Sequence, residues 1–233
     1  MKQSVLVIAF SGLSFLGYSQ TAEQTKAIDA YIKKVIRVNE IPGMAVGIVK
    51  DNKVTFQKYY GTETLESDKK VNPQSMFRIY SNTKLMSNIG LFQLIEQGKI
   101  SLDDNISKYL DHIPDAWKNV QVKHLVSHSS GIPDWIRFED ISLNATNAEV
   151  IDRLSKEKMD FETGSEYRYN QTNYMLIAML IEKITGEKFE DYILENQFSD
   201  AKNQVVFSSD SKEEIPNRIV KYIYNKDTHK YDK

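Results

Sequence analysis

Apolar residues recur at helical spacing, or in long runs, in three parts of the chain. Residues 27–39 carry them on one face, which predicts an amphipathic helix. Residues 81–97 form a strongly apolar helical segment that Gly98 ends. Residues 172–184 are apolar on nearly every side and are followed by Gly186, which predicts a buried helix and not a membrane span. We expect the last two helices to pack through two sets of side chains: Leu85, Ile89 and Phe92 against Leu176, Ile177 and Leu180.

Two strands are predicted in the N-terminal part. Residues 44–49 and 54–60 are rich in apolar and aromatic side chains and are separated by a short polar turn at Asp51-Asn52. A two-residue turn of this kind joins antiparallel strands. The pattern therefore predicts a hairpin.

The end of the chain predicts further strands. Residues 218–224 have strand character, residues 225–227 form a turn, and Tyr231 begins a partner strand. So few strands make a poor sheet by themselves. We therefore expect an α+β fold, a helical body with an antiparallel sheet that is incomplete in this chain.

The first residues resemble an export signal. Met1-Lys2 gives a positive start, residues 5–16 are apolar but too short to span a bilayer, and Ser19-Gln20 fits a cleavage site. We assign residues 1–20 to a signal peptide and residues 21–233 to one hydrolase domain, exported to the periplasm or secreted from a bacterium. We expect no membrane span in the mature chain.

Bulk composition excludes several classes of protein. The 233 residues include 30 basic and 32 acidic ones, with no basic cluster, so nucleic acid is not an expected partner. With zero cysteines, the chain has neither disulfides nor a thiolate metal site.

Ser81 and Lys84 form a candidate nucleophile and its partner amine. Residues three apart share a helix face, so the Lys84 amine can approach the Ser81 hydroxyl, and a helix start favours developing negative charge. The Ser-x-x-Lys spacing also starts at Ser67, Ser155, Ser199 and Ser209, but only at Ser81 does a long apolar helix follow. The alternative is that Ser81 only caps a helix.

Five ordered segments resemble the serine beta-lactamase/penicillin-binding-protein superfamily, nearest its class C beta-lactamase-like and D-aminopeptidase/esterase branch. They lie within roughly residues 28–224 and are residues 41–46, 77–84, 124–133, 164–174 and 181–186. The resemblance implies a beta-lactamase/transpeptidase-like fold. It also implies that Ser81 is acylated, with Lys84 and Tyr169 exchanging its proton. Which of the two is the base stays open; the alternative for Tyr169 is a packed aromatic residue with a bonded hydroxyl.

The chain departs from the family pattern at two points. Where the family has Tyr-x-Asn, this chain has Tyr169-Asn170-Gln171. Gln171 is therefore the candidate substrate-binding residue, since its amide can donate to a substrate carbonyl or to Lys84. The family's third motif, a Lys-Thr-Gly or His-x-Gly strand that supplies an oxyanion donor, is expected beyond Lys233. We therefore expect a chain truncated before that motif, and loss of one such donor lowers rates by about 10²–10³.

A metal site and an aromatic cleft rim are the weaker interpretations. His124 and His128 are spaced i, i+4, but no further ligand is evident, so no metal is expected. Trp135 and Phe138 could line a cleft, and we favour the core for both.

Two functions remain open. One is a serine hydrolase acting on an amide, ester or lactam through an acyl-Ser81 intermediate. The other is a catalytically impaired relative that at most binds peptide or cell-wall fragments. The expected partner is a small-molecule or peptide substrate, and no cofactor is expected. The sequence determines neither the precise substrate nor the oligomeric state.

Overall fold

The computed structural model describes residues 21–208, 213–225 and 227–232, so the expected signal peptide lies outside the described residues. The chain divides into two compact units. One comprises residues 1–76 and 217–233, and the other comprises residues 77–216. Of the described helices, none combines the length and apolar character needed to cross a membrane.

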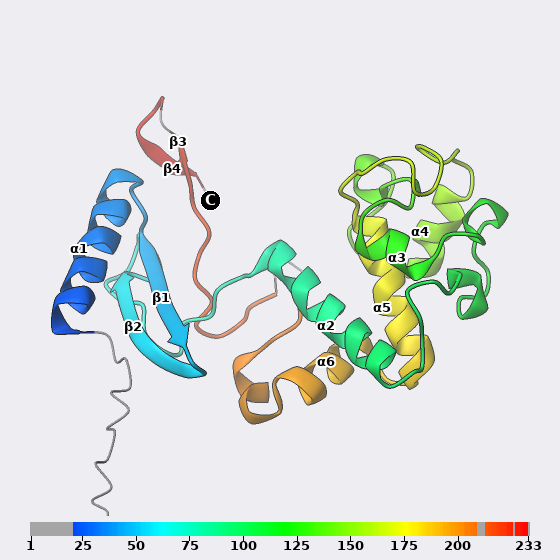
Figure 1. Ribbon diagram of the computed structural model, residues 1–233. Helices are drawn as coiled ribbons and strands as arrows, with labels where there is room; N and C mark the ends of the chain where they lie inside the picture. Colours follow the sequence, from blue (N-terminus) through cyan, green and yellow to red (C-terminus); the bar gives the residue numbers. More distant parts are fainter. Residues whose placement is uncertain (1–20, 209–212, 226, 233) are drawn as a thin grey trace, which may run out of the picture. The chain divides into compact units, whose positions relative to one another are not determined.

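The first unit contains a helix, α1 (Ala22–Val38), and a hairpin of β1 (Gly43–Lys50) and β2 (Lys53–Gly61) (Figure 1). The helix starts earlier than predicted because Thr21 and Gln24 form a capping box ahead of it. The strands are antiparallel, as predicted, with Lys50 opposite Lys53. Asp51 and Asn52 both have positive φ, 51° and 58°, as a type I′ turn requires.

A second hairpin in the same unit is shorter than the sequence predicts. It consists of β3 (Ile223–Asn225) and β4 (Lys230–Asp232), whereas residues 218–222 lie outside the strand. The reason is a competing pairing: Met76 bonds the chain at Asn217 and Ile219 through its backbone, over 2.9 Å each. The described strands thus form two separate two-stranded sheets, consistent with a helical protein whose sheet is incomplete.

The second unit is the helical body. Its helices are α2 (Thr83–Glu96), α3 (Val122–Val126), α4 (Asn147–Leu154), α5 (Gln171–Thr185) and α6 (Phe189–Gln197). Short 3₁₀ turns precede, connect and follow these helices: Tyr80–Asn82, Ile106–Lys108, Asp115–Trp117, Trp135–Arg137 and Ser199–Gln204. Helix α5, drawn yellow in Figure 1, contacts α2, α3 and α6.

Helix α5 is the centre of this core. Leu176, Ile177, Leu180 and Ile181 are fully buried in it, and Gly186 ends the helix in the left-handed conformation at φ 75°. These features confirm the prediction of a buried helix. Trp135 and Phe138 pack against the same core, which confirms the interpretation favoured for them.

Helix α2 packs against α5, but not through the face that the sequence suggested. Leu85, Ile89 and Phe92 are exposed, whereas Leu91 and Leu94 are buried. The prediction failed because α2 is apolar on nearly every side, so its periodicity does not select a face. Gly90 marks a close approach to a third helix: an added Cβ there would lie 2.8 Å from Ile193 Cδ1 of α6, so the Ile193 side chain would have to shift.

Candidate active site

Ser81 lies in the 3₁₀ turn Tyr80–Asn82, directly ahead of α2. The sequence placed it at the helix start, and the structure separates the turn from the helix that begins at Thr83. Asn82, the N-cap residue, makes no side-chain capping bond. Ser81 is exposed, so its hydroxyl is accessible beside the positive end of a helix dipole.

The residue before Ser81 has an unusual backbone. Tyr80 has φ 44°, a region that bulky residues rarely adopt. Strained backbone of this kind persists where the surrounding structure enforces it, and it is frequent at functional sites.

Tyr169 meets Ser81 directly. Its hydroxyl, Oη, donates a hydrogen bond to Ser81 Oγ over 2.8 Å. Tyr169 lies just before α5, whose N-cap residue is Asn170. The side chain of Asn170 accepts a hydrogen bond from the Asn173 N–H over 3.2 Å, which starts the helix immediately after Tyr169.

Lys84 lies against the same tyrosine. Its Nζ donates to Gln171 Oε1 over 2.7 Å, and it lies 4.8 Å from the ring centroid of Tyr169 and 5.1 Å from that of Tyr174. The bond to Gln171 runs opposite to the one the sequence suggested, because the ammonium group is the donor. The structure thus brings all four sequence-selected side chains, Ser81, Lys84, Tyr169 and Gln171, into one constellation.

These neighbours change the acidity of Tyr169. Burial is the largest single influence and raises the pKa of its phenol. Hydrogen bonds from adjacent side chains and the positive charge of Lys84 act the other way and outweigh burial, so the pKa lies below the ordinary tyrosine value. The bonded side chains are Lys84, Ser81 and Gln171. The Tyr169 hydroxyl beside Ser81 therefore loses its proton more readily than an ordinary tyrosine does.

A loop after α3 fixes the start of α5. Asn170 Nδ2 donates to the Ile132 carbonyl over 2.6 Å, and the Gln171 N–H donates to Asp134 Oδ1 over 3.0 Å. Thr172 Oγ1 donates to the Pro133 carbonyl over 2.8 Å. Each bond falls on a residue next to Tyr169 or shortly after it, so the loop determines where the phenol lies.

His124 and His128, the candidate metal ligands, each use Nδ1 for a hydrogen bond within the protein. His124 Nδ1 accepts from the Gln121 N–H, and His128 Nδ1 accepts from the Asn170 N–H, over 3.1 Å each. Within the described ranges, no group of three or more histidine and acidic side chains could hold a metal ion. The sequence gave no signal that His128 touches Tyr169.

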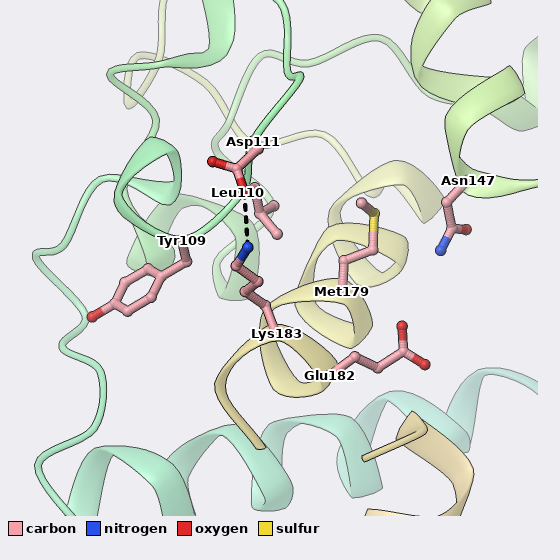
Figure 2. Close-up of a pocket in the computed structure, with 7 residues that line it drawn as sticks. All are labelled: Tyr109, Leu110, Asp111, Asn147, Met179, Glu182 and Lys183. Atoms are coloured by element: carbon pink, nitrogen blue, oxygen red, sulfur yellow. Dashed lines mark hydrogen bonds and ion pairs between the residues drawn. The ribbon is translucent and has the colours of Figure 1, made fainter. Parts of the chain in front are cut away.

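A cavity of about 370 Å³ lies elsewhere in the helical body (Figure 2). Its lining residues are Tyr109, Leu110, Asp111, Asn147, Met179, Glu182 and Lys183. Lys183 pairs with Asp111 over 2.8 Å, drawn as a dashed line in Figure 2, and Glu182 accepts a hydrogen bond from the Phe189 N–H over 3.0 Å. Its charged groups are therefore engaged with the protein, and it contains no member of the Ser81 constellation.

Comparison with known proteins identifies the family and the fold of the chain. The family model described as Beta-lactamase matches residues 28–216. Protein flp of Staphylococcus aureus (strain N315) is 28% identical over 179 residues, covering 74% of this chain and 36% of that protein. The N-acetylmuramyl-L-alanine amidase of Bacillus subtilis (strain 168) is 27% identical over 192 residues, covering 74% and 43%.

A solved structure shares the fold. The octameric penicillin-binding protein homologue from Pyrococcus abyssi superimposes with a TM-score of 0.71 at 24% identity, covering 89% of this chain and 49% of that one. The chain thus spans less than half the length of each of these relatives.

Proposed function

The chain belongs to the beta-lactamase family, and we propose that it is a serine hydrolase that acts on an amide, ester or lactam through an acyl-Ser81 intermediate. The observation that carries the proposal is the 2.8 Å hydrogen bond between Tyr169 Oη and Ser81 Oγ. It joins a nucleophile to a phenol whose pKa is lowered by its neighbours, which is the pairing that acyl transfer requires.

In the first step Ser81 Oγ attacks the substrate carbonyl carbon. For this step Tyr169 must be a phenolate: it then accepts the Ser81 proton, which reverses the direction of the hydrogen bond seen in the structure, and Lys84 stabilises the phenolate by its charge. We assign the role of base to Lys84 and Tyr169 jointly, because a proton on either leaves the pair with the same total charge. The backbone N–H of Ser81, at the start of the helix, is proposed as one donor to the oxyanion.

In the second step the tetrahedral intermediate collapses. The bond from the carbonyl carbon to the leaving nitrogen or oxygen breaks, and Tyr169 returns the proton to that atom. Water then attacks the acyl carbon and loses a proton to the same pair. The bond from that carbon to Ser81 Oγ breaks, and the pair returns the proton to Ser81 Oγ, which releases the acid and regenerates Ser81. These steps use only side chains of the protein and water. The amidase among the relatives supports an amide substrate.

A fluorophosphonate probe tests the assignment of Ser81, because it phosphonylates activated serines. We expect one adduct on the full chain, located at Ser81 by peptide mass spectrometry and lost in Ser81→Ala. Ser199→Ala is the matched control, since Ser199 has the same Ser-x-x-Lys spacing and is also exposed. Among the described residues, no tyrosine hydroxyl bonds to the Ser199 side chain. An adduct at another serine, or one that survives Ser81→Ala, would overturn the proposal.

Turnover separates hydrolysis from mere binding. With a chromogenic ester or a lactam, a hydrolase releases product repeatedly, whereas an impaired relative that only binds stays acylated or unmodified. Product in excess of enzyme, abolished in Ser81→Ala, supports the hydrolase.

We also propose that the protein is exported, on the basis of the pattern in residues 1–20. N-terminal sequencing of protein expressed in a bacterium should then find a chain that begins near Thr21. A chain that keeps Met1 and stays in the cytoplasmic fraction would contradict this.

A further inference from the structure

His128 clamps the segment that carries Tyr169 on both sides. The Arg168 N–H donates to the carbonyl of His128 over 2.9 Å, and the Asn170 N–H donates to His128 Nδ1 over 3.1 Å. Between these two bonds, the ring of Tyr169 lies on the imidazole, with centroids 4.7 Å apart and planes at 41°. One residue therefore contacts three consecutive residues, with the tyrosine in the middle.

The His128 side chain is built into this position. Its exposed fraction is 8%, and its backbone adopts a left-handed φ of 56° in the turn after α3. Tyr174 packs on the same imidazole at 5.3 Å between centroids. Few rotamers fit such a site, so the ring supports Tyr169 from a fixed place.

The hydrogen bond to Asn170 determines the protonation state of His128. A backbone N–H can only donate, so Nδ1 must carry a lone pair, and the imidazole is neutral with its hydrogen on Nε2. Protonation would place two donors face to face and break the bond.

The surroundings favour the neutral form as well. Burial lowers the pKa of His128, the charge of Lys84 lowers it further, and the carboxylate of Asp134 raises it by less. The titratable groups that face the imidazole come from α2, from the loop after α3, from the segment before α5 and from α5 itself: Lys84, Asp134, Tyr167, Tyr169 and Tyr174.

We propose that the neutral imidazole of His128 is a positioning residue that holds the Tyr169 phenol at Ser81, and that proton uptake by His128 releases the phenol. The proposal rests on the acyl-transfer function proposed above. His128 does not reach the nucleophile itself; it acts through Tyr169, so its effect should appear in the behaviour of that phenol.

Two substitutions divide the contacts of His128. His128→Phe keeps an aromatic ring against Tyr169 but removes the acceptor for the Asn170 N–H. His128→Asn keeps an acceptor near the Nδ1 position and tolerates the left-handed φ, but removes the ring and the titrating group. His124→Phe is the matched control, because it removes the same kind of Nδ1 acceptor from a backbone N–H, that of Gln121.

The first measurement is the rate at which a fluorophosphonate labels Ser81. It is made at pH values above and below the ordinary histidine pKa of about 6.5. We expect His128→Phe to label at least about tenfold more slowly than the wild type, since small misplacements of a reacting group have large effects. His128→Asn should label faster than His128→Phe. In the wild type the labelling rate should fall at low pH as His128 takes up a proton, and His128→Asn should lack that part of the fall. His124→Phe should label at the wild-type rate.

The second measurement does not depend on activity. In protein carrying ¹³C-labelled tyrosine, the Tyr169 phenol resonance, identified by its absence in Tyr169→Phe, reports the pKa of that group. We expect His128→Phe to move this pKa upward, toward the ordinary tyrosine value, because the phenol drifts from Lys84 and Ser81. His124→Phe should leave it unchanged.

The outcomes separate this inference from the proposed function. If the wild type is not labelled at all, the function fails, and the Tyr169 pKa in the variants still decides the positioning role. If the wild type is labelled and His128→Phe shows the same rate and the same Tyr169 pKa, the positioning role is overturned. Should His128→Phe fail to fold, His128→Asn still tests the positioning role. If its labelling rate falls at low pH just as that of the wild type does, the positioning role is overturned.

Discussion

Tyr169 Oη and Ser81 Oγ lie 2.8 Å apart, although 88 residues separate them along the chain. Ser81 lies in the 3₁₀ turn that leads into α2, and Tyr169 immediately precedes the N-cap of α5. Because α2 and α5 pack against each other, the two residues meet where two helices begin. Both helix dipoles then present their positive ends near the hydroxyl that must become negative.

Tyr169→Phe should remove the proton acceptor and leave the ring in place. We expect the rate of Ser81 labelling to fall by about 10²–10⁴, the usual contribution of a general base. The free energy of unfolding should change by about 1 kcal/mol or less, because the lost hydrogen bond is partly exposed to solvent. Labelling kinetics and urea unfolding measure the two effects. A rate within twofold of the wild type would exclude Tyr169 from proton transfer.

Lys84→Met should raise the pKa of Tyr169, because it removes a hydrogen bond and a positive charge that both favour the phenolate. The rise of labelling rate with pH should therefore move to higher pH, and the rate near pH 7 should fall. Lys183→Met is the control: Lys183 is paired with Asp111 and lies in the cavity of Figure 2, away from Ser81. An unshifted pH profile in Lys84→Met would show that Lys84 does not act on the phenol.

Gly131→Ala should destabilise the loop that fixes the start of α5. Gly131 has φ 73°, and an added Cβ would lie 2.1 Å from the Phe161 carbonyl oxygen. We expect a loss of more than about 2 kcal/mol in the free energy of unfolding, from backbone strain and the clash together. Gly98→Ala is the matched control, since Gly98 has φ 69° but open space around the Cβ position, and it should lose only about 1 kcal/mol. Chemical unfolding of both variants measures the difference, and equal losses would show that the close approach to Phe161 is unimportant.

Stability should depend on pH through His124 and His128. Burial is the largest cause that lowers the pKa of each imidazole in the folded protein, whereas in the unfolded chain each titrates near about 6.5. Just below pH 6.5 the unfolded chain therefore binds more protons, so stability is complete above that pH and is lost as pH falls through the folded-state values. Thermal unfolding between about pH 5 and pH 8 measures this, because ordinary carboxylates stay ionised over that range. His128→Asn should flatten the slope; a slope equal to that of the wild type would contradict the contribution of His128.

The existence of the main helices followed directly from the sequence, whereas their packing faces did not. Residues 172–184 are apolar enough to predict α5 almost to its ends, and Gly186 marks its C-terminus by a conformation that few other residues adopt. In α2 the same uniform apolarity gave the wrong face. Gly90 is an example from the same helix: its lack of a side chain leaves room for Ile193 of α6, and a sequence does not reveal the neighbour for which space is left.

The residues of the site could likewise be predicted from the sequence, whereas their contacts could not. Ser81, Lys84, Tyr169 and Gln171 were selected from motifs, since motifs record residue types at fixed spacing. The direction of the Lys84–Gln171 bond and the clamp around Tyr169 depend on contacts across some 40 to 90 residues of chain, and no local pattern encodes them. The sequence showed the i, i+4 spacing of His124 and His128, but not the contact between the His128 imidazole and Tyr169.

The bonds between the loop after α3 and the start of α5 have a consequence for how the site opens. The amide hydrogens of Asn170 and Gln171 are bonded to the side chains of His128 and Asp134, respectively, and separation of this loop from the helix releases both amides at once. Local opening exposes such amides together, as one cooperative unit. In native-state hydrogen exchange the two amides should share one free energy of opening and one dependence on denaturant. The stability of this loop thus limits how often the segment that carries Tyr169 is freed from its support.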